Sequence, residues 1–108
     1  MWKISFYEDH RGKSSVLDFI RGLTAKDRAK VNNALRLLEE FGTELGMPHA
    51  RRIQKGLWEL RPGANRLFYF MQVRGRFVIL HGYRKRSRKA PEKEIATALR
   101  YMKNLSEE

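Results

Sequence analysis

The pattern of apolar and polar positions divides the first half of the chain into one strand and two helices. Apolar side chains alternate with polar ones over residues 2–7, which predicts a half-buried strand. Farther on, apolar residues recur every three or four positions, which predicts two amphipathic helices. The first opens with capping-box spacing at Ser15, the second repeats that signal at Thr24, and Gly42 is suited to end it. We expect these two helices to form a hairpin.

The second half of the chain predicts three strands and a last helix. A loop around Gly46 and Pro48 leads into strands over residues 56–61, 66–73 and 76–83, where β-branched and aromatic residues are frequent. Proline, glycine and asparagine at 62–65 and an Arg-Gly pair at 74–75 supply the turns between them. Pro91 is well placed as the first residue of a final helix with one apolar face.

The predicted order of elements is β-α-α-β-β-β-α in a single domain spanning residues 1–108. Neither the helices nor the sheet could bury an apolar face alone. We therefore expect a two-layer α+β domain with the helices packed on one face of a mainly antiparallel sheet. The uncovered face of that sheet would carry the arginines.

The positive charge of the chain is concentrated in one segment. The formal net charge is +11, and residues 51–89 hold twelve Lys and Arg side chains against a single acid, Glu59. Aromatic residues are interleaved with these cations. Such a surface suits a polyanion whose bases can stack on the rings, so nucleic acid is the expected partner. The alternative is a charged face that is simply solvated.

Composition argues against several other classes of function. The chain has no cysteine, and its three histidines lack the spacing of metal ligands. The basic segment has no cluster of acids for Mg²⁺, and no glycine-rich phosphate loop occurs. No apolar stretch is long enough to span a membrane, and the first residues do not form a signal peptide. We expect a cytoplasmic protein without metal, cofactor or membrane contact.

Two arginines are the first candidates for chemistry. Arg61 and Arg66 flank a short turn, so their guanidinium groups can approach each other and grip one phosphate. The alternative is that Glu59 forms a salt bridge with Arg61 while Arg66 only covers the sheet.

A basic run and a histidine follow. Residues 84–89 contain five cations in six positions directly after the last predicted strand, either as a phosphate-binding segment or as a solvated linker. His81 lies within that strand and is either a hydrogen-bonded core residue or a catalyst.

Several stretches of the chain are similar to a known family: Lys55-Gly56-Leu57-Trp58-Glu59-Leu60-Arg61, Arg66-Leu67-Phe68-Tyr69, Ile79-Leu80-His81-Gly82-Tyr83-Arg84-Lys85 and Ala90-Pro91-Glu92. With the two-helix N-terminal half, they resemble the HigB-like branch of the RelE toxin superfamily, which consists of phage- and plasmid-associated toxins. The resemblance spans essentially the whole chain. It implies a RelE-like fold, a ribosome-dependent messenger-RNA endonuclease that works without metal, and a helix-turn-helix, HigA-like antitoxin as partner.

The resemblance also implies roles for individual residues. Arg66 matches an arginine of the central strand, Lys85 or Arg86 matches a basic residue beyond the last strand, and Arg61 fits as a second phosphate clamp. The general base stays open between Tyr83, His81 and Glu59. The expected catalytic residues are thus Arg61, Arg66, Lys85, Arg86, His81, Tyr83 and Glu59. The expected RNA-binding residues are Arg51, Arg52, Lys55, Arg84, Arg88 and Lys89.

Two other functions are compatible with the sequence. The superfamily includes ParE-type proteins, which inhibit DNA gyrase without cutting RNA. A non-catalytic module that binds RNA or the ribosome would carry the same charge.

Overall fold

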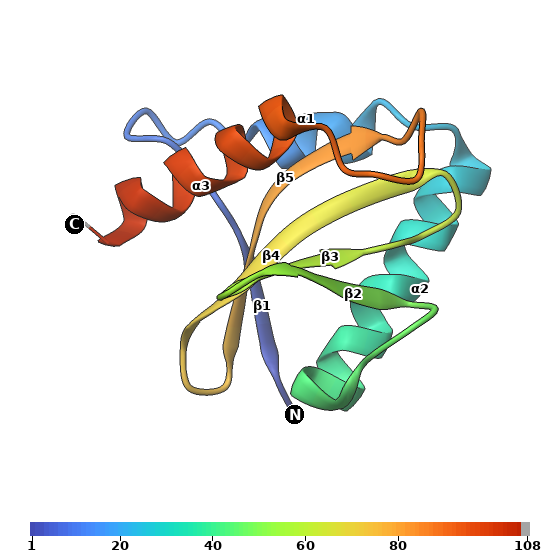
Figure 1. Cartoon of the computed structure of the whole chain (residues 1–108), viewed down its shortest axis with the longest axis horizontal. Coiled ribbons are helices and arrows are strands. Elements are labelled where there is room, and N and C mark those ends of the chain that lie inside the picture. Colours follow the sequence, from blue (N-terminus) through green and yellow to red (C-terminus); the bar gives the residue numbers. More distant parts are fainter. Residues whose placement is uncertain (107–108) are drawn as a thin grey trace.

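The computed structural model describes residues 1–106, which form one mixed sheet with helices against it (Figure 1). The elements in chain order are β1 (Lys3–Phe6), α1 (Ser15–Arg21), α2 (Ala25–Phe41), the short 3-10 helix η1 (Gly42–Glu44), β2 (Ala50–Gln54), β3 (Leu57–Leu60), β4 (Asn65–Val73), β5 (Arg76–Arg84) and α3 (Glu92–Ser106).

The strands lie in the order β1-β5-β4-β3-β2. Only β1 is parallel to its neighbour, β5, and the other pairs in the described part of the chain are antiparallel. The predicted α+β class and mainly antiparallel sheet are confirmed. The predicted element order was incomplete, because β2 occupies a segment that was expected to be a loop. Arg52 and Gln54 are exposed on this edge strand, so its sequence lacks a clear apolar period.

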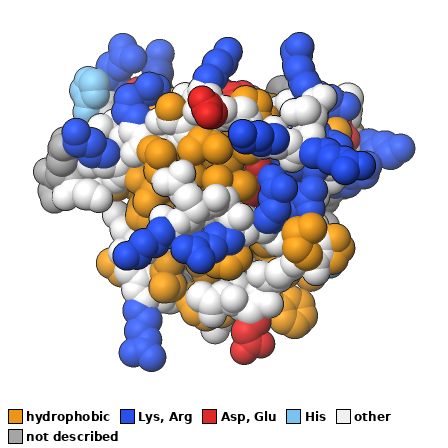
Figure 2. Space-filling model, in the orientation of Figure 1, with side chains coloured by type: hydrophobic (Ala, Val, Ile, Leu, Met, Phe, Trp, Pro, Cys, Tyr) orange, Lys and Arg blue, Asp and Glu red, His pale blue; other side chains and the backbone are white. Residues whose placement is uncertain are grey.

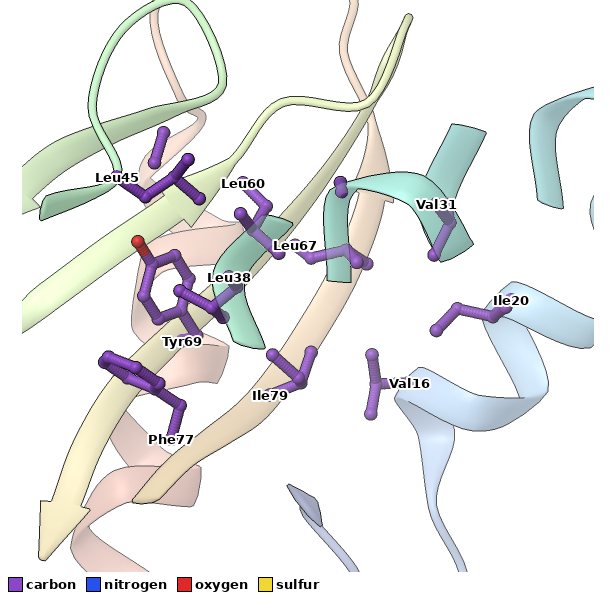
Figure 3. Close-up of a cluster of buried hydrophobic side chains, with 12 residues drawn as sticks. Val16, Ile20, Val31, Leu38, Leu45, Leu60, Leu67, Tyr69, Phe77 and Ile79 are labelled. Carbon is purple, nitrogen blue, oxygen red and sulfur yellow. The ribbon is translucent and has the colours of Figure 1, made fainter. Parts of the chain in front are cut away.

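The helices cover both faces of the sheet, so the prediction that they share one face is wrong. Leu67 and Tyr69 of β4 belong to the core formed with α1 and α2, shown in Figure 3. Phe68, between them, points to the other face and joins a second core. That second core includes Ala98 of α3. Because β4 and β5 are apolar on both sides, each face needs its own cover.

Local sequence signals place the ends of the helices. Ser14 caps α1 by accepting a hydrogen bond from the backbone N–H of Leu17, one residue before the predicted cap. Thr24 caps α2 in the same way, as predicted. Gly42 ends α2 at φ 55°, and a Cβ there would lie 1.9 Å from the ring of Trp2. Glycine thus lets β1 pack against the end of α2.

The segment between β5 and α3 is exposed until it reaches the start of the helix. Residues 84–89 are exposed, whereas Ala90 is buried against the second core. The carbonyl of Pro91 accepts hydrogen bonds from the N–H groups of Glu94 and Ile95, so this proline starts the helix close to the predicted position. None of the helices in residues 1–106 has the length and hydropathy needed to cross a membrane.

Candidate functional site

A buried carboxylate lies at the centre of the basic segment. Glu59 on β3 is paired in register with Arg51 on β2 and with Phe68 on β4. Arg66 and Phe68 are two residues apart on β4 and therefore share a face, which is the face covered by α3. The side chain of Glu59 has no exposed surface. An ionised carboxylate in such a position requires close cationic or hydrogen-bonding partners.

Three arginines and a tyrosine supply those partners. Oε1 of Glu59 lies 3.3 Å from Nη2 of Arg51, 3.8 Å from Nε of Arg66 and 4.0 Å from Nε of Arg61. The hydroxyl of Tyr83 donates a hydrogen bond of 2.9 Å to Oε2. We call these five residues the Glu59 cluster. With three guanidinium groups and one carboxylate it keeps a surplus of two positive charges, which favours an anionic ligand.

The arginines of the Glu59 cluster differ in exposure. The side chains of Arg51 and Arg61 are 35% and 22% exposed, whereas that of Arg66 is 7% exposed. Arg66 also donates hydrogen bonds of 2.8 Å to the carbonyls of Gly63 and Asn65. Arg61 and Arg66 approach each other, as their flanking positions predicted, and the anion that they share in the structure is the carboxylate of Glu59. The expectation that both lie on an uncovered face is wrong for Arg66, which lies on the face covered by α3 and is held by the carbonyls of Gly63 and Asn65.

Burial and charge shift the protonation of this cluster. Burial, followed by the nearby charge of Arg61, lowers the pKa of Arg66. Burial, followed by the negative charge of Glu59, raises the pKa of Tyr83, so its hydroxyl keeps its proton at neutral pH. Nε of Arg51 and Nε of Arg61 are buried and lack a hydrogen-bond partner. As the side chains stand, these two N–H groups are not accessible to a ligand.

Two of the predicted general bases are poorly placed for that role. Glu59 has no exposed surface and already interacts with the arginines and Tyr83, which disagrees with direct contact with a substrate. Tyr83 is only 6% exposed, and its hydroxyl already donates a hydrogen bond to Glu59. The predicted salt bridge between Glu59 and Arg61 is present, together with two others that the sequence did not indicate.

His81 lies apart from the Glu59 cluster. It pairs with Phe68, which pairs with Glu59, so two strand spacings of about 4.8 Å separate His81 from Glu59 along the sheet. Nε2 of His81 is 3.0 Å from Oε1 of Glu94 on α3, and the ring stacks on Phe68. The histidine links sheet and helix and is 17% exposed. Glu94 was not predicted as its partner, because no sequence signal joins residues separated by a loop.

A basic groove of about 440 Å³ adjoins the cluster. It runs between β2 and the segment that leads into α3, and we call it the β2 groove. Arg51 lines it as well as holding Glu59. The residues that line it are Arg51, Arg52, Ile53, Arg88, Lys89, Ala90 and Ile95. Four cations beside three apolar residues suit a phosphate backbone with bases.

The remaining residues, of which Lys85 and Arg86 were predicted as catalytic and Lys55 and Arg84 as RNA-binding, are more dispersed. Lys85 and Arg86 are exposed in the segment after β5, and Lys55 is exposed in the turn between β2 and β3. Arg84 points away from Tyr83 and pairs with Asp27 of α2 at 3.3 Å, so it does not join the Glu59 cluster. Figure 2 shows many Lys and Arg side chains on the right of the molecule, where Figure 1 has the β3–β4 turn and the segment after β5.

No group of three or more metal-ligating side chains capable of holding an ion occurs within residues 1–106.

Comparison with known proteins identifies the family. Residues 18–103 match the family model described as phage derived protein Gp49-like (DUF891). The chain belongs to this Gp49-like family. No curated protein matches it in sequence.

Two solved structures share the fold of this Gp49-like protein. The toxin–antitoxin complex RelBE2 from Mycobacterium tuberculosis contains a chain that matches with a TM-score of 0.55 and 22% identity, covering 78% of this chain and 98% of that one. The isolated E. coli RelE toxin matches with a TM-score of 0.50 and 17% identity, covering 94% and 99%. The predicted RelE-like fold is confirmed, and the resemblance to the RelE superfamily holds at the level of the fold.

Proposed function

We propose that this protein is the toxin of a toxin–antitoxin pair and acts as an endoribonuclease that cleaves messenger RNA on the ribosome. The observation that carries the proposal is the Glu59 cluster, where three arginines converge on one carboxylate and retain a surplus of positive charge. Support also comes from the fold, since the similar structures are a RelBE2 toxin–antitoxin complex and a RelE toxin.

The proposed reaction is attack of an RNA 2′-hydroxyl on the adjacent phosphorus. The oxygen–phosphorus bond to the next nucleotide breaks, leaving a 2′,3′-cyclic phosphate and a free 5′-hydroxyl. Negative charge builds on the phosphate oxygens in the transition state, and preorganised cations stabilise it. Arg51 and Arg61 are the donors in this proposal, because their side chains are partly exposed.

Glu59, Arg66 and Tyr83 are positioning residues in this account. The carboxylate draws the arginines together, which opposes the repulsion between their charges. Tyr83 satisfies the second carboxylate oxygen. Arg66 ties the carboxylate to the turn between β3 and β4 through the carbonyls of Gly63 and Asn65. Arginines that are already held in place do not need to rearrange when the transition state forms.

In this proposal the RNA strand lies in the β2 groove and reaches the arginines of the Glu59 cluster. Arg52, Arg88 and Lys89 can contact phosphates, while Ile53 and Ile95 offer apolar surface to bases. We further propose a cognate antitoxin, of HigA-like type, that holds the toxin inactive.

A non-catalytic RNA- or ribosome-binding module is the second candidate. One observation favours it: the predicted bases are already engaged, Glu59 and Tyr83 with each other and His81 with Glu94. In the nuclease account, proton transfer falls to water or ribosomal RNA, and electrostatic stabilisation supplies most of the rate.

Brief induction in a bacterial host, followed by pulse labelling and mapping of messenger 5′ ends, tests the proposal. We expect protein synthesis to stop first and new 5′ ends to appear within coding regions. Arg61→Ala should abolish both effects. Arrest of DNA synthesis while translation continues would instead indicate a ParE-like gyrase inhibitor. Arrest of translation with intact messengers would indicate the non-catalytic module.

A further inference from the structure

A second groove, of about 370 Å³, lies between α2 and the turn that joins β3 to β4. We call it the α2 groove. Its helical wall consists of positions that share one side of α2, including Lys30, Asn33 and Leu37. Its other wall is formed by His49 and by Arg61 with the residues after it. Within residues 1–106 no acidic side chain lines this groove, and its polar groups are those that contact phosphates and base edges.

The walls of the α2 groove are held in place by local contacts. The side chain of Lys30 lies over Gly63, where a Cβ would be 3.1 Å from its Cδ. The carbonyl of His49 accepts a hydrogen bond of 2.9 Å from the backbone N–H of Arg61. The amide oxygen of Asn33 accepts a hydrogen bond from Arg36, which leaves the amide N–H groups as donors.

Both grooves reach the same anion. Arg61 lines the α2 groove and lies 4.0 Å from Oε1 of Glu59. Arg51 lines the β2 groove and lies 3.3 Å from the same oxygen. A phosphate held between Arg51 and Arg61 would therefore have a basic groove on each side, into which the nucleic-acid strand could continue. This arrangement suits a polymer and exceeds what a single phosphate monoester requires.

We propose that the α2 groove is a nucleotide-binding subsite for single-stranded RNA, adjacent to the phosphate at the Glu59 cluster and distinct from the strand held in the β2 groove. Lys30 and His49 contact the backbone, Asn33 donates to a base edge, and Leu37 with Pro62 provides apolar surface. The inference rests on the proposed function, because it names where the same substrate binds beyond the reacting phosphate.

The test measures the affinity of the full chain for a fluorescent 12-nucleotide RNA whose 2′-hydroxyls are methylated, so that it cannot be cut. Lys30→Glu should weaken binding at least about tenfold, and Lys30→Ala should reduce the slope of log affinity against log salt by about 0.7. His49→Ala should weaken binding without changing the melting temperature, because its side chain is exposed. Lys26→Glu is the matched control, since Lys26 is exposed on α2 but does not line the groove.

Equal RNA affinities of the Lys30→Glu and Lys26→Glu variants would overturn the subsite. A Lys30→Glu variant that binds RNA normally but no longer binds the antitoxin would also overturn it. Cross-linking with 4-thiouridine RNA gives a second reading. Cross-links to residues 29–37 are expected, and cross-links confined to residues 51–53 and 84–95 would contradict the inference. Failure of the proposed function gives a different result. If the wild-type protein leaves messengers intact but its RNA binding still depends on Lys30, the subsite is supported and the nuclease activity is contradicted.

Discussion

Arg61 and Arg66 hold the same oxygen of Glu59, but their surroundings differ. Arg61 is partly exposed and lines the α2 groove, whereas Arg66 is almost fully buried and bonded to backbone carbonyls. Their convergence could be predicted because they flank one turn. The burial of Glu59 could not, because it depends on how β2, β4 and α3 close around β3. The sequence places a charged side chain on a strand but does not show that neighbouring elements will bury it.

Replacement of each arginine with alanine should separate activity from stability. Arg61→Ala should reduce cleavage by roughly 10² to 10³, or about 3 to 4 kcal/mol, with little change in melting temperature. Arg66→Ala should also reduce cleavage, but it leaves the carbonyls of Gly63 and Asn65 without their donor and should destabilise the fold by about 2 to 3 kcal/mol. Cleavage rates and urea unfolding curves of the two variants provide the comparison. Equal stability of both would contradict the support role of Arg66.

Tyr83 should make stability depend on alkaline pH. Its pKa is raised in the folded state above the ordinary value near 10, mainly by burial. The protonated hydroxyl therefore stabilises the fold fully below pH 10. Above that pH the unfolded chain releases its proton while the folded chain retains it, so the free energy of unfolding falls. Tyr83→Phe should lose about 2 kcal/mol at pH 7, because the bond to Glu59 is gone, but should show a smaller alkaline fall. Parallel curves for both proteins in urea titrations between pH 7 and 11 would refute this.

Among the elements, β1, the central strands and the helices were predictable, and the edge strand β2 was not. β4, β5 and the two N-terminal helices have strong apolar periods and clear caps or turns. β2 has alternating exposed side chains and carries two arginines, so it resembled a loop. The position of α3 was mispredicted although β4 and β5 are apolar on both faces, which already called for a second cover.

Contact between α1 and β5 depends on Gly82. A Cβ at this position would lie 2.5 Å from Cδ2 of Phe19 and 2.9 Å from Cδ2 of Leu67. We expect Gly82→Ala to lower the free energy of unfolding by about 1 to 3 kcal/mol, because α1 must move away from the sheet. Gly46→Ala is the control, since nothing lies within 4 Å of its added Cβ. Thermal melts of both variants decide the matter, and a Gly82→Ala variant as stable as the control would disprove the close contact.

At the scale of the whole molecule, the charge distribution predicts how it binds RNA. Half of the twelve cations between residues 51 and 89 belong to the Glu59 cluster or line the β2 groove, namely Arg51, Arg52, Arg61, Arg66, Arg88 and Lys89. We expect RNA affinity to fall steeply with salt, because each phosphate contact releases counterions. Reversal of Arg86 and Arg88 to Glu should weaken binding to all sequences alike. Filter binding over a salt series is the measurement, and an affinity independent of salt would contradict it.

Analysis of the fragment ends tests the central claim most directly. Messenger RNA programmed on ribosomes is incubated with the wild-type protein and with Arg61→Ala, and the 3′ ends of the upstream fragments are identified. The account predicts 2′,3′-cyclic phosphate ends with the wild type and a rate roughly 10² to 10³ lower with the variant. Fragments that end in a free 3′-hydroxyl, or an Arg61→Ala variant with the wild-type rate, would contradict it.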